Sequence, residues 1–163
     1  YSPAPLKKIQ ADLAVSFGYR HLIRPQGLNS ASCPVVNLHI SYLPYNRGAH
    51  PNFWSFYDDT PSGVSIHLID NGIDTGPILH QRKLTFNPAS MTFRQTYQQL
   101  LNDLQQLFID NIDSILSTDW ELHEQPASGT VHYLADLPSD FSGWDSNIAT
   151  EIKRLKSNRR SIL

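Results

Sequence analysis

Apolar side chains recur at steps of three and four residues between positions 93 and 116, and this pattern most restricts how the chain can fold. They are Phe93, Tyr97, Leu100, Leu101, Leu104, Leu107, Phe108, Ile112, Ile115 and Leu116. The spacing predicts one amphipathic helix about 36 Å long, and Thr92 and Gln95 are placed to form a capping box at its start. The apolar stripe is wide enough to cover a sheet face, so we expect a β-sheet beneath it.

Short apolar segments before and after this helix supply the strands of that sheet. We expect strands at 11–18, 35–40, 63–69, 77–84 and 130–134. Residues 51–58 are expected to form a helix, and the spacing of Ile148, Ile152 and Leu155 predicts a last amphipathic helix. Strands that alternate with helices predict an α/β fold.

Composition limits the classes of partner and cofactor. The chain has 163 residues, 40% of them hydrophobic, which suits one domain with a buried core. A net charge of −2 argues against nucleic-acid binding, and no apolar run is long enough to span a membrane. The single cysteine, Cys33, excludes an internal disulfide and a Cys-based zinc site, and fits a cytoplasmic location. No pair of histidines has tight metal-ligand spacing, so no metal is expected.

Polar side chains interrupt the predicted strands. Asn37 and His39 lie two residues apart and therefore share one face of a strand. His67 has a similar setting in the next strand, and the segment 70–76 contains two aspartates and two glycines. Spacing alone leaves two interpretations open, a catalytic group and a set of satisfied polar residues beside an ordinary turn.

Three motifs, in this order, resemble the catalytic core of the folate-dependent formyltransferases. They are Asn37-Leu38-His39-Ile40-Ser41-Tyr42-Leu43-Pro44 with Asn46-Arg47-Gly48, then Gly63-Val64-Ser65-Ile66-His67, then Asp70-x-Gly72-x-Asp74-Thr75-Gly76. The resemblance extends over residues 11–81. That family includes glycinamide ribonucleotide formyltransferase, methionyl-tRNA formyltransferase and the sugar N-formyltransferases.

The resemblance implies a Rossmann-like fold, 10-formyltetrahydrofolate as the formyl donor, and catalysis by Asn37, His39 and Asp74. The implied folate-binding residues are Tyr19, His21, Leu22, Ile23, Asp70, Asn71, Gly72 and Ile73. The Asn37 amide and a protonated His39 would stabilise the tetrahedral oxyanion, and Asp74 would act as base or orienter. His67 either shapes the pocket or packs in its strand, and it stays outside the catalytic set.

The loop 44–61 is similar to that of the sugar N-formyltransferases, which predicts a nucleotide-linked amino-deoxysugar as the acceptor. Asn46 and Asn52 are expected to meet sugar hydroxyls, whereas at least two of Phe53, Trp54 and Phe56 are expected to pack a helix onto the sheet. The alternatives are formylation of glycinamide ribonucleotide or another amine, hydrolysis of the formyl-folate, and a catalytically idle binding module.

The family's first strands normally precede the position of Ala11. We therefore expect residues 1–163 to form one catalytic domain that is incomplete at its N-terminus, with a core at 1–118 and a C-terminal extension at 119–163. The acceptor is expected to be a small molecule, and homodimer formation is left open.

Overall fold

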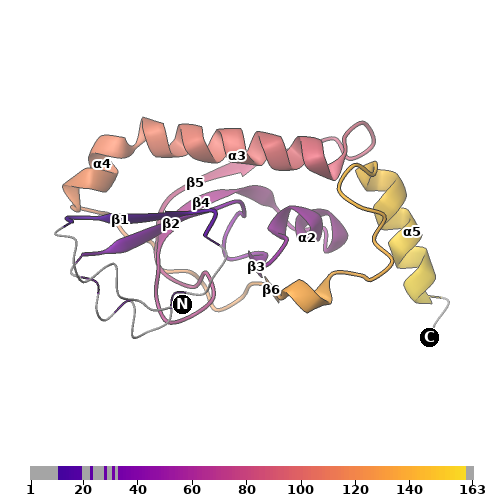
Figure 1. The fold of residues 1–163 in the computed structure, drawn as a ribbon, viewed down its shortest axis with the longest axis horizontal. Helices are drawn as coiled ribbons and strands as arrows, with labels where there is room; N and C mark the ends of the chain where they lie inside the picture. The colour runs from indigo at the N-terminus through magenta and orange to yellow at the C-terminus, as the bar shows by residue number, and fades with distance from the viewer. Residues whose placement is uncertain (1–10, 20–22, 24–27, 29–30, 32, 161–163) are drawn as a thin grey trace.

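A mixed sheet lies at the centre of the molecule, and a long helix runs along one of its faces (Figure 1). The computed structural model describes residues 11–19, 23, 28, 31 and 33–160. In these residues the sheet consists of β1 (Ala14–Phe17), β2 (Val35–His39), β4 (Ser62–Leu68) and β5 (Ile78–Leu84), in the order β1-β2-β4-β5. β1 and β2 are parallel, whereas β2–β4 and β4–β5 are antiparallel. Four of the five predicted strands are found in this sheet, and the α/β class is confirmed.

The helix on the sheet is α3 (Phe93–Asp110), and the predicted capping box starts it. The Gln95 backbone N–H donates to Thr92 Oγ1 at 3.2 Å, and the Thr92 N–H donates to Gln95 Oε1 at 2.9 Å. Leu100, Leu104 and Leu107 are buried in one cluster with side chains from β2, β4 and β5. Burial of each such side chain contributes roughly 1.5–3 kcal/mol, so this face of α3 holds the helix on the sheet.

The single helix predicted over 93–116 is wrong in one respect, because it is interrupted at Asn111. The backbone there leaves helical geometry (φ −119°, ψ 15°), and α4 (Ile112–Ser117) begins beyond it. The Asn111 Nδ2 donates to the Leu107 carbonyl at 2.8 Å. An asparagine side chain that binds a nearby carbonyl competes with the backbone ladder, which accounts for a break at this residue.

A second core joins α2 (Pro51–Tyr57) to the start of α3 and to α5 (Ile148–Arg160). Phe53 and Trp54 are buried in it, and the half-buried Phe56 packs against it. These aromatic residues do pack, as predicted, but their cluster joins α2 to α3 and α5 and, among the described residues, contains no side chain of the central sheet. None of the helices in the described ranges combines the length and hydrophobicity that a bilayer-spanning segment requires.

A short parallel pair, β3 (Arg47–Gly48) with β6 (Val131–His132), ties the C-terminal part of the chain to the loop that follows β2. The strand predicted at 130–134 is shorter than expected because the chain turns into the 3-10 helix η2 (Leu134–Asp136). Gly48 has φ 85°, and a Cβ there would lie 2.3 Å from the His132 carbonyl oxygen. Only glycine permits this approach, which places residues 131–136 beside the predicted site.

Candidate active site

The three predicted catalytic side chains meet at Asp74. β2 positions Asn37 and His39, and the loop between β4 and β5 positions Asp74. Asn37 Nδ2 lies 3.3 Å from Asp74 Oδ1, and His39 Nε2 lies 3.6 Å from Asp74 Oδ2. The Gly48 backbone N–H donates to the same Oδ2 at 2.8 Å. The sheet and its loops therefore bring an amide, an imidazole and a carboxylate together.

The loop that carries Asp74 is held from several sides. Asp74 has a left-handed backbone with φ 51°, which is uncommon outside glycine and recurs at functional sites. A Cβ at Gly76 would lie 1.9 Å from the Leu68 carbonyl oxygen, so only glycine fits there. Gln125 Nε2 donates to the carbonyls of Asp74 (2.9 Å) and Gly76 (2.7 Å). The position of the carboxylate is thus set by fixed backbone contacts.

His67 belongs to this cluster, although the sequence left it out. It pairs with Asn37 across β2 and β4, and its side chain is 1% exposed. Its Nδ1 lies 2.7 Å from the Leu68 carbonyl, so Nδ1 carries the hydrogen and Nε2 is an acceptor. Asn37 Nδ2 lies 3.3 Å from that Nε2. The Asn37 NH₂ therefore faces two acceptors, His67 and Asp74, which fixes the orientation of the amide.

Burial and charge set the protonation of the pair His39 and Asp74. Burial lowers the pKa of the His39 imidazole below 6.5, and this outweighs the opposing effect of Asp74. For Asp74, burial alone raises the pKa, but the charge interaction with His39 and the hydrogen bond from the Gly48 N–H lower it far below its usual value. His39 is therefore neutral and Asp74 ionised at neutral pH. Burial therefore works against the protonated His39 expected from the sequence, and the depressed pKa makes Asp74 a weak base.

A cavity of about 370 Å³ opens beside the cluster. Asn37, His67 and Asp74 line it, whereas His39 contacts Asp74 without lining the cavity. Among the predicted folate-binding residues, the lining includes Tyr19, Ile23, Asp70, Gly72 and Ile73. Asn71 lies in the same loop, is exposed and is not part of the lining. His21 and Leu22 fall outside the described residues.

The structure contradicts the acceptor contacts expected of Asn46 and Asn52, because both side chains are buried and satisfied. Asn46 Nδ2 donates to Thr60 Oγ1 at 2.8 Å, and Asn52 Nδ2 donates to the Phe93 carbonyl at 2.9 Å. Arg47 holds the loop, since its Nη2 donates to Gln125 Oε1 at 2.8 Å. Gln125 and Thr130, which binds the Asn46 backbone N–H at 2.7 Å, were missed. No local sequence pattern marks contacts that span 78 or more positions.

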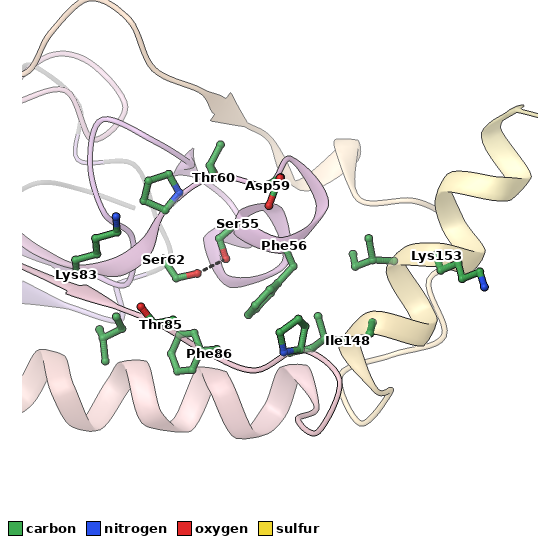
Figure 2. A pocket seen from close by; sticks show the side chains of 15 residues that line it. Ser55, Phe56, Asp59, Thr60, Ser62, Lys83, Thr85, Phe86, Ile148 and Lys153 are labelled. Atoms are coloured by element: carbon green, nitrogen blue, oxygen red, sulfur yellow. Dashed lines mark hydrogen bonds between the residues drawn. The ribbon is translucent and has the colours of Figure 1, made fainter.

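A second cavity, of about 470 Å³, lies between α2, the end of β5 and α5 (Figure 2). Phe56, Phe86 and Ile148 give it an apolar lining, and Ser62 donates to Ser55 at 2.9 Å along one wall. No predicted site residue lines this cavity. Over the described part of the chain, no group of three or more His, Cys, Asp or Glu residues is arranged to hold a metal ion.

These features define an α/β protein with an Asn–His–Asp cluster beside a cavity at the end of its central sheet. Residues 3–112 match the family model described as formyl transferase, and the chain belongs to that family. It is 28% identical over 149 residues to the dTDP-4-amino-4,6-dideoxyglucose formyltransferase of Mycobacterium bovis, a match that covers 91% of this chain. It is 29% identical to the methionyl-tRNA formyltransferase of Thermodesulfovibrio yellowstonii over 83% of this chain.

A solved structure with bound ligands has a similar Rossmann-like fold. It is the formyltransferase PseJ from Anoxybacillus kamchatkensis, in complex with UDP-4,6-dideoxy-4-formamido-L-AltNAc and tetrahydrofolate. The two chains are 39% identical with a TM-score of 0.75, over 86% of this chain and 76% of the other. This chain spans 57% of the length of the mycobacterial relative and 43% of the methionyl-tRNA enzyme.

Proposed function

We propose that this protein transfers a formyl group from 10-formyltetrahydrofolate to the amino group of a nucleotide-linked amino-deoxysugar. The observation that carries the proposal is the position of the ionised Asp74 carboxylate, in contact with Asn37, His39 and His67 at the wall of a cavity. The similarity to sugar N-formyltransferases, one of them bound to tetrahydrofolate and a UDP-linked sugar, supports both substrate classes.

The cavity suits a folate. A pterin presents a flat ring with polar edges, and it needs apolar side chains against its faces and polar groups at its rim. Ile23, Ile69 and Ile73 provide apolar lining next to Asp70 and Gly72. We propose that these residues, with Tyr19, hold the donor. When bound, 10-formyltetrahydrofolate supplies the activated formyl group.

Within this site, Asn37 and His39 would act on the charges that develop during transfer. As the acceptor nitrogen attacks the formyl carbon, negative charge develops on the formyl oxygen. The Asn37 N–H that lies 3.3 Å from Asp74 in the free site turns to that oxygen and stabilises it, while the other N–H stays on His67. The amine must also lose a proton, and the neutral His39, which contacts Asp74 but does not line the cavity, accepts it through a bridging water. The imidazolium that results lies 3.6 Å from the ionised Asp74, which stabilises it until its proton passes to the departing nitrogen.

In this proposal Asp74 orients and stabilises, and it does not itself remove the proton. Its pKa is depressed, so it holds a proton poorly, whereas its charge favours every positively polarised group around it. His67 acts through Asn37, because its Nε2 accepts one amide hydrogen and keeps the NH₂ toward the cluster. His67 is therefore a positioning residue.

A mass-spectrometric screen of the full-length protein tests the proposal. The protein is incubated with 10-formyltetrahydrofolate and a panel of nucleotide-linked amino sugars, with glycinamide ribonucleotide as a further acceptor. We expect one sugar to gain the mass of carbon monoxide. Formylation of glycinamide ribonucleotide alone would overturn the sugar assignment, release of formate without any acceptor would indicate a hydrolase, and folate binding without turnover would indicate a binding module.

A further inference from the structure

We propose that Tyr133 and Leu134 form a platform on which the nucleobase of the acceptor stacks. The inference rests on the proposed function and adds the part of the molecule that recognises the nucleotide. Both residues line the cavity that contains Asn37 and Asp74. Yet Tyr133 is 56% exposed and Leu134 is 75% exposed, which is high for large apolar side chains. Apolar side chains left open at the mouth of a polar site mark a surface that a ligand covers.

The backbone beneath these side chains is firmly held. β6 pairs with β3, and the Ala49 N–H donates to the His132 carbonyl at 2.8 Å. The His132 ring stacks on Trp54 with centroids 3.9 Å apart and an interplanar angle of 5°. After these contacts, the Tyr133 N–H donates to Asp136 Oδ2 at 2.6 Å in η2, the orange turn beside β6 in Figure 1. A platform on fixed backbone loses little further entropy when it binds a ligand.

The lining residues of the cavity divide into two sets according to the elements that carry them. One set, from the end of β1 and the loop 69–74, includes the residues assigned above to the folate. The other set comes from β3, β6, η2 and the residues next to them, and consists of Gly48, Ala49, His132, Tyr133 and Leu134. Asn37 and His67, from β2 and β4, line the cavity as well. Donor and acceptor must both reach Asn37 and Asp74 for transfer to occur. The set not used by the donor is therefore left for the acceptor.

The exposure of the side chains that line the cavity indicates where each end of the acceptor binds. The amino sugar must lie against the catalytic side chains, where Asn37 is half-buried and His67 is buried. The base, at the other end of the diphosphate, reaches the rim. Tyr133 and Leu134 are the exposed apolar side chains of the acceptor set there, whereas Tyr19, which is also exposed, belongs to the set assigned to the folate. A phenol ring beside an aliphatic side chain offers the flat apolar surface on which a base stacks.

Binding of UDP and dTDP, measured by calorimetry on the full-length protein without any turnover, tests the platform. Loss of base stacking typically weakens binding about tenfold. We expect Tyr133→Ala to weaken nucleoside diphosphate binding by about that factor and to raise KM for the sugar nucleotide similarly. Tyr133→Phe keeps the ring and should stay within about twofold of the wild type, as should KM for the folate. Tyr97→Ala, at a tyrosine 45% exposed on α3 and outside the cavity, is the matched control.

Two results would overturn the platform. One is a Tyr133→Ala protein that melts like the wild type and binds UDP and dTDP equally well, with Leu134→Ala also without effect. The other is a Tyr133→Ala protein in which folate binding weakens and nucleotide binding does not. Different results would refute the proposed function. If nucleotide binding depends on Tyr133 but no formyl transfer occurs, the proposed reaction is refuted and the platform is supported. If formyl transfer occurs without nucleotide binding, the platform is refuted and the reaction is supported.

Discussion

Asp74→Asn is the substitution that most directly tests the mechanism. Asparagine has the size of aspartate, and its carbonyl can still accept the Gly48 N–H that donates to Oδ2 at 2.8 Å. The change removes the negative charge and leaves the loop contacts of Gln125 with the carbonyls of Asp74 and Gly76 in place. A loss of activity can therefore be assigned to charge rather than to a displaced loop.

The magnitude follows from the distance to His39. Two unit charges 3.6 Å apart attract each other, by roughly 4 kcal/mol at the effective dielectric constant of a partly buried pair. That energy is available only while His39 carries the proton of the attacking amine. Since each 1.4 kcal/mol is a factor of ten, we expect kcat to fall by about a hundredfold to a thousandfold. We expect KM for the folate to change much less.

Steady-state kinetics and NMR titration of the His39 ring provide the two measurements. Because Asp74 raises the pKa of His39 against the effect of burial, Asp74→Asn should lower that pKa further. Asp103→Asn, the same change at one of the two carboxylates that pair with Arg82, serves as the control and should leave both quantities unchanged. A folded Asp74→Asn protein that keeps a tenth or more of the wild-type kcat, or whose His39 pKa rises, would refute the reasoning.

Three further outcomes are expected. Burial lowers the pKa of His39 in the folded state. The stability that the neutral imidazole contributes is therefore present above the pKa of His39 in the unfolded state, and it is lost as the pH falls through the pKa in the folded state. Tm measured from about pH 8 to pH 5 should fall more steeply in the wild type than in His39→Asn, and equal slopes would contradict this. His67→Leu, which removes one of the two acceptors of the Asn37 amide, should lower kcat about tenfold. His67→Gln should recover part of that loss, and equal kcat values in both variants would count against a positioning role. Leu104→Ala, at a fully buried position, should lower the free energy of unfolding, measured by chemical denaturation, by about 2–5 kcal/mol. The control Leu116→Ala, at a side chain 58% exposed, should change it by no more than about 0.5 kcal/mol. Similar losses in both variants would be inconsistent with the burial of Leu104.

Local patterns predicted most of the secondary structure because burial imposes a period on the sequence. The three- and four-residue spacing located α3, and the two-residue spacing correctly placed Asn37 and His39 on one face of β2. The break at Asn111 was missed because it depends on one side-chain hydrogen bond with Leu107, which the apolar spacing does not record.

Burial of polar side chains was the part that the sequence could not predict. Asn46 and Asn52 lie in a polar loop and were assigned to the substrate, but tertiary contacts with Thr60 and Phe93 bury them. Conversely, Tyr133 lies in an unremarkable segment of the sequence and reaches the cavity only because β6 pairs with β3. Pairing between distant segments decides which side chains face the cavity.

The same pairing bears on the boundary placed at residue 118. Gln125 connects Arg47 to the carbonyls of the Asp74 loop, and Thr130 holds the Asn46 backbone on the other side of β3. Both residues come from the predicted extension, and both act on loops that position the proposed catalytic side chains. Separation at 118 would therefore release the Asp74 loop and remove the wall that contains Tyr133. We propose that residues 119–136 belong to the catalytic unit, and that the more peripheral part of the extension is α5 with the second core that it covers.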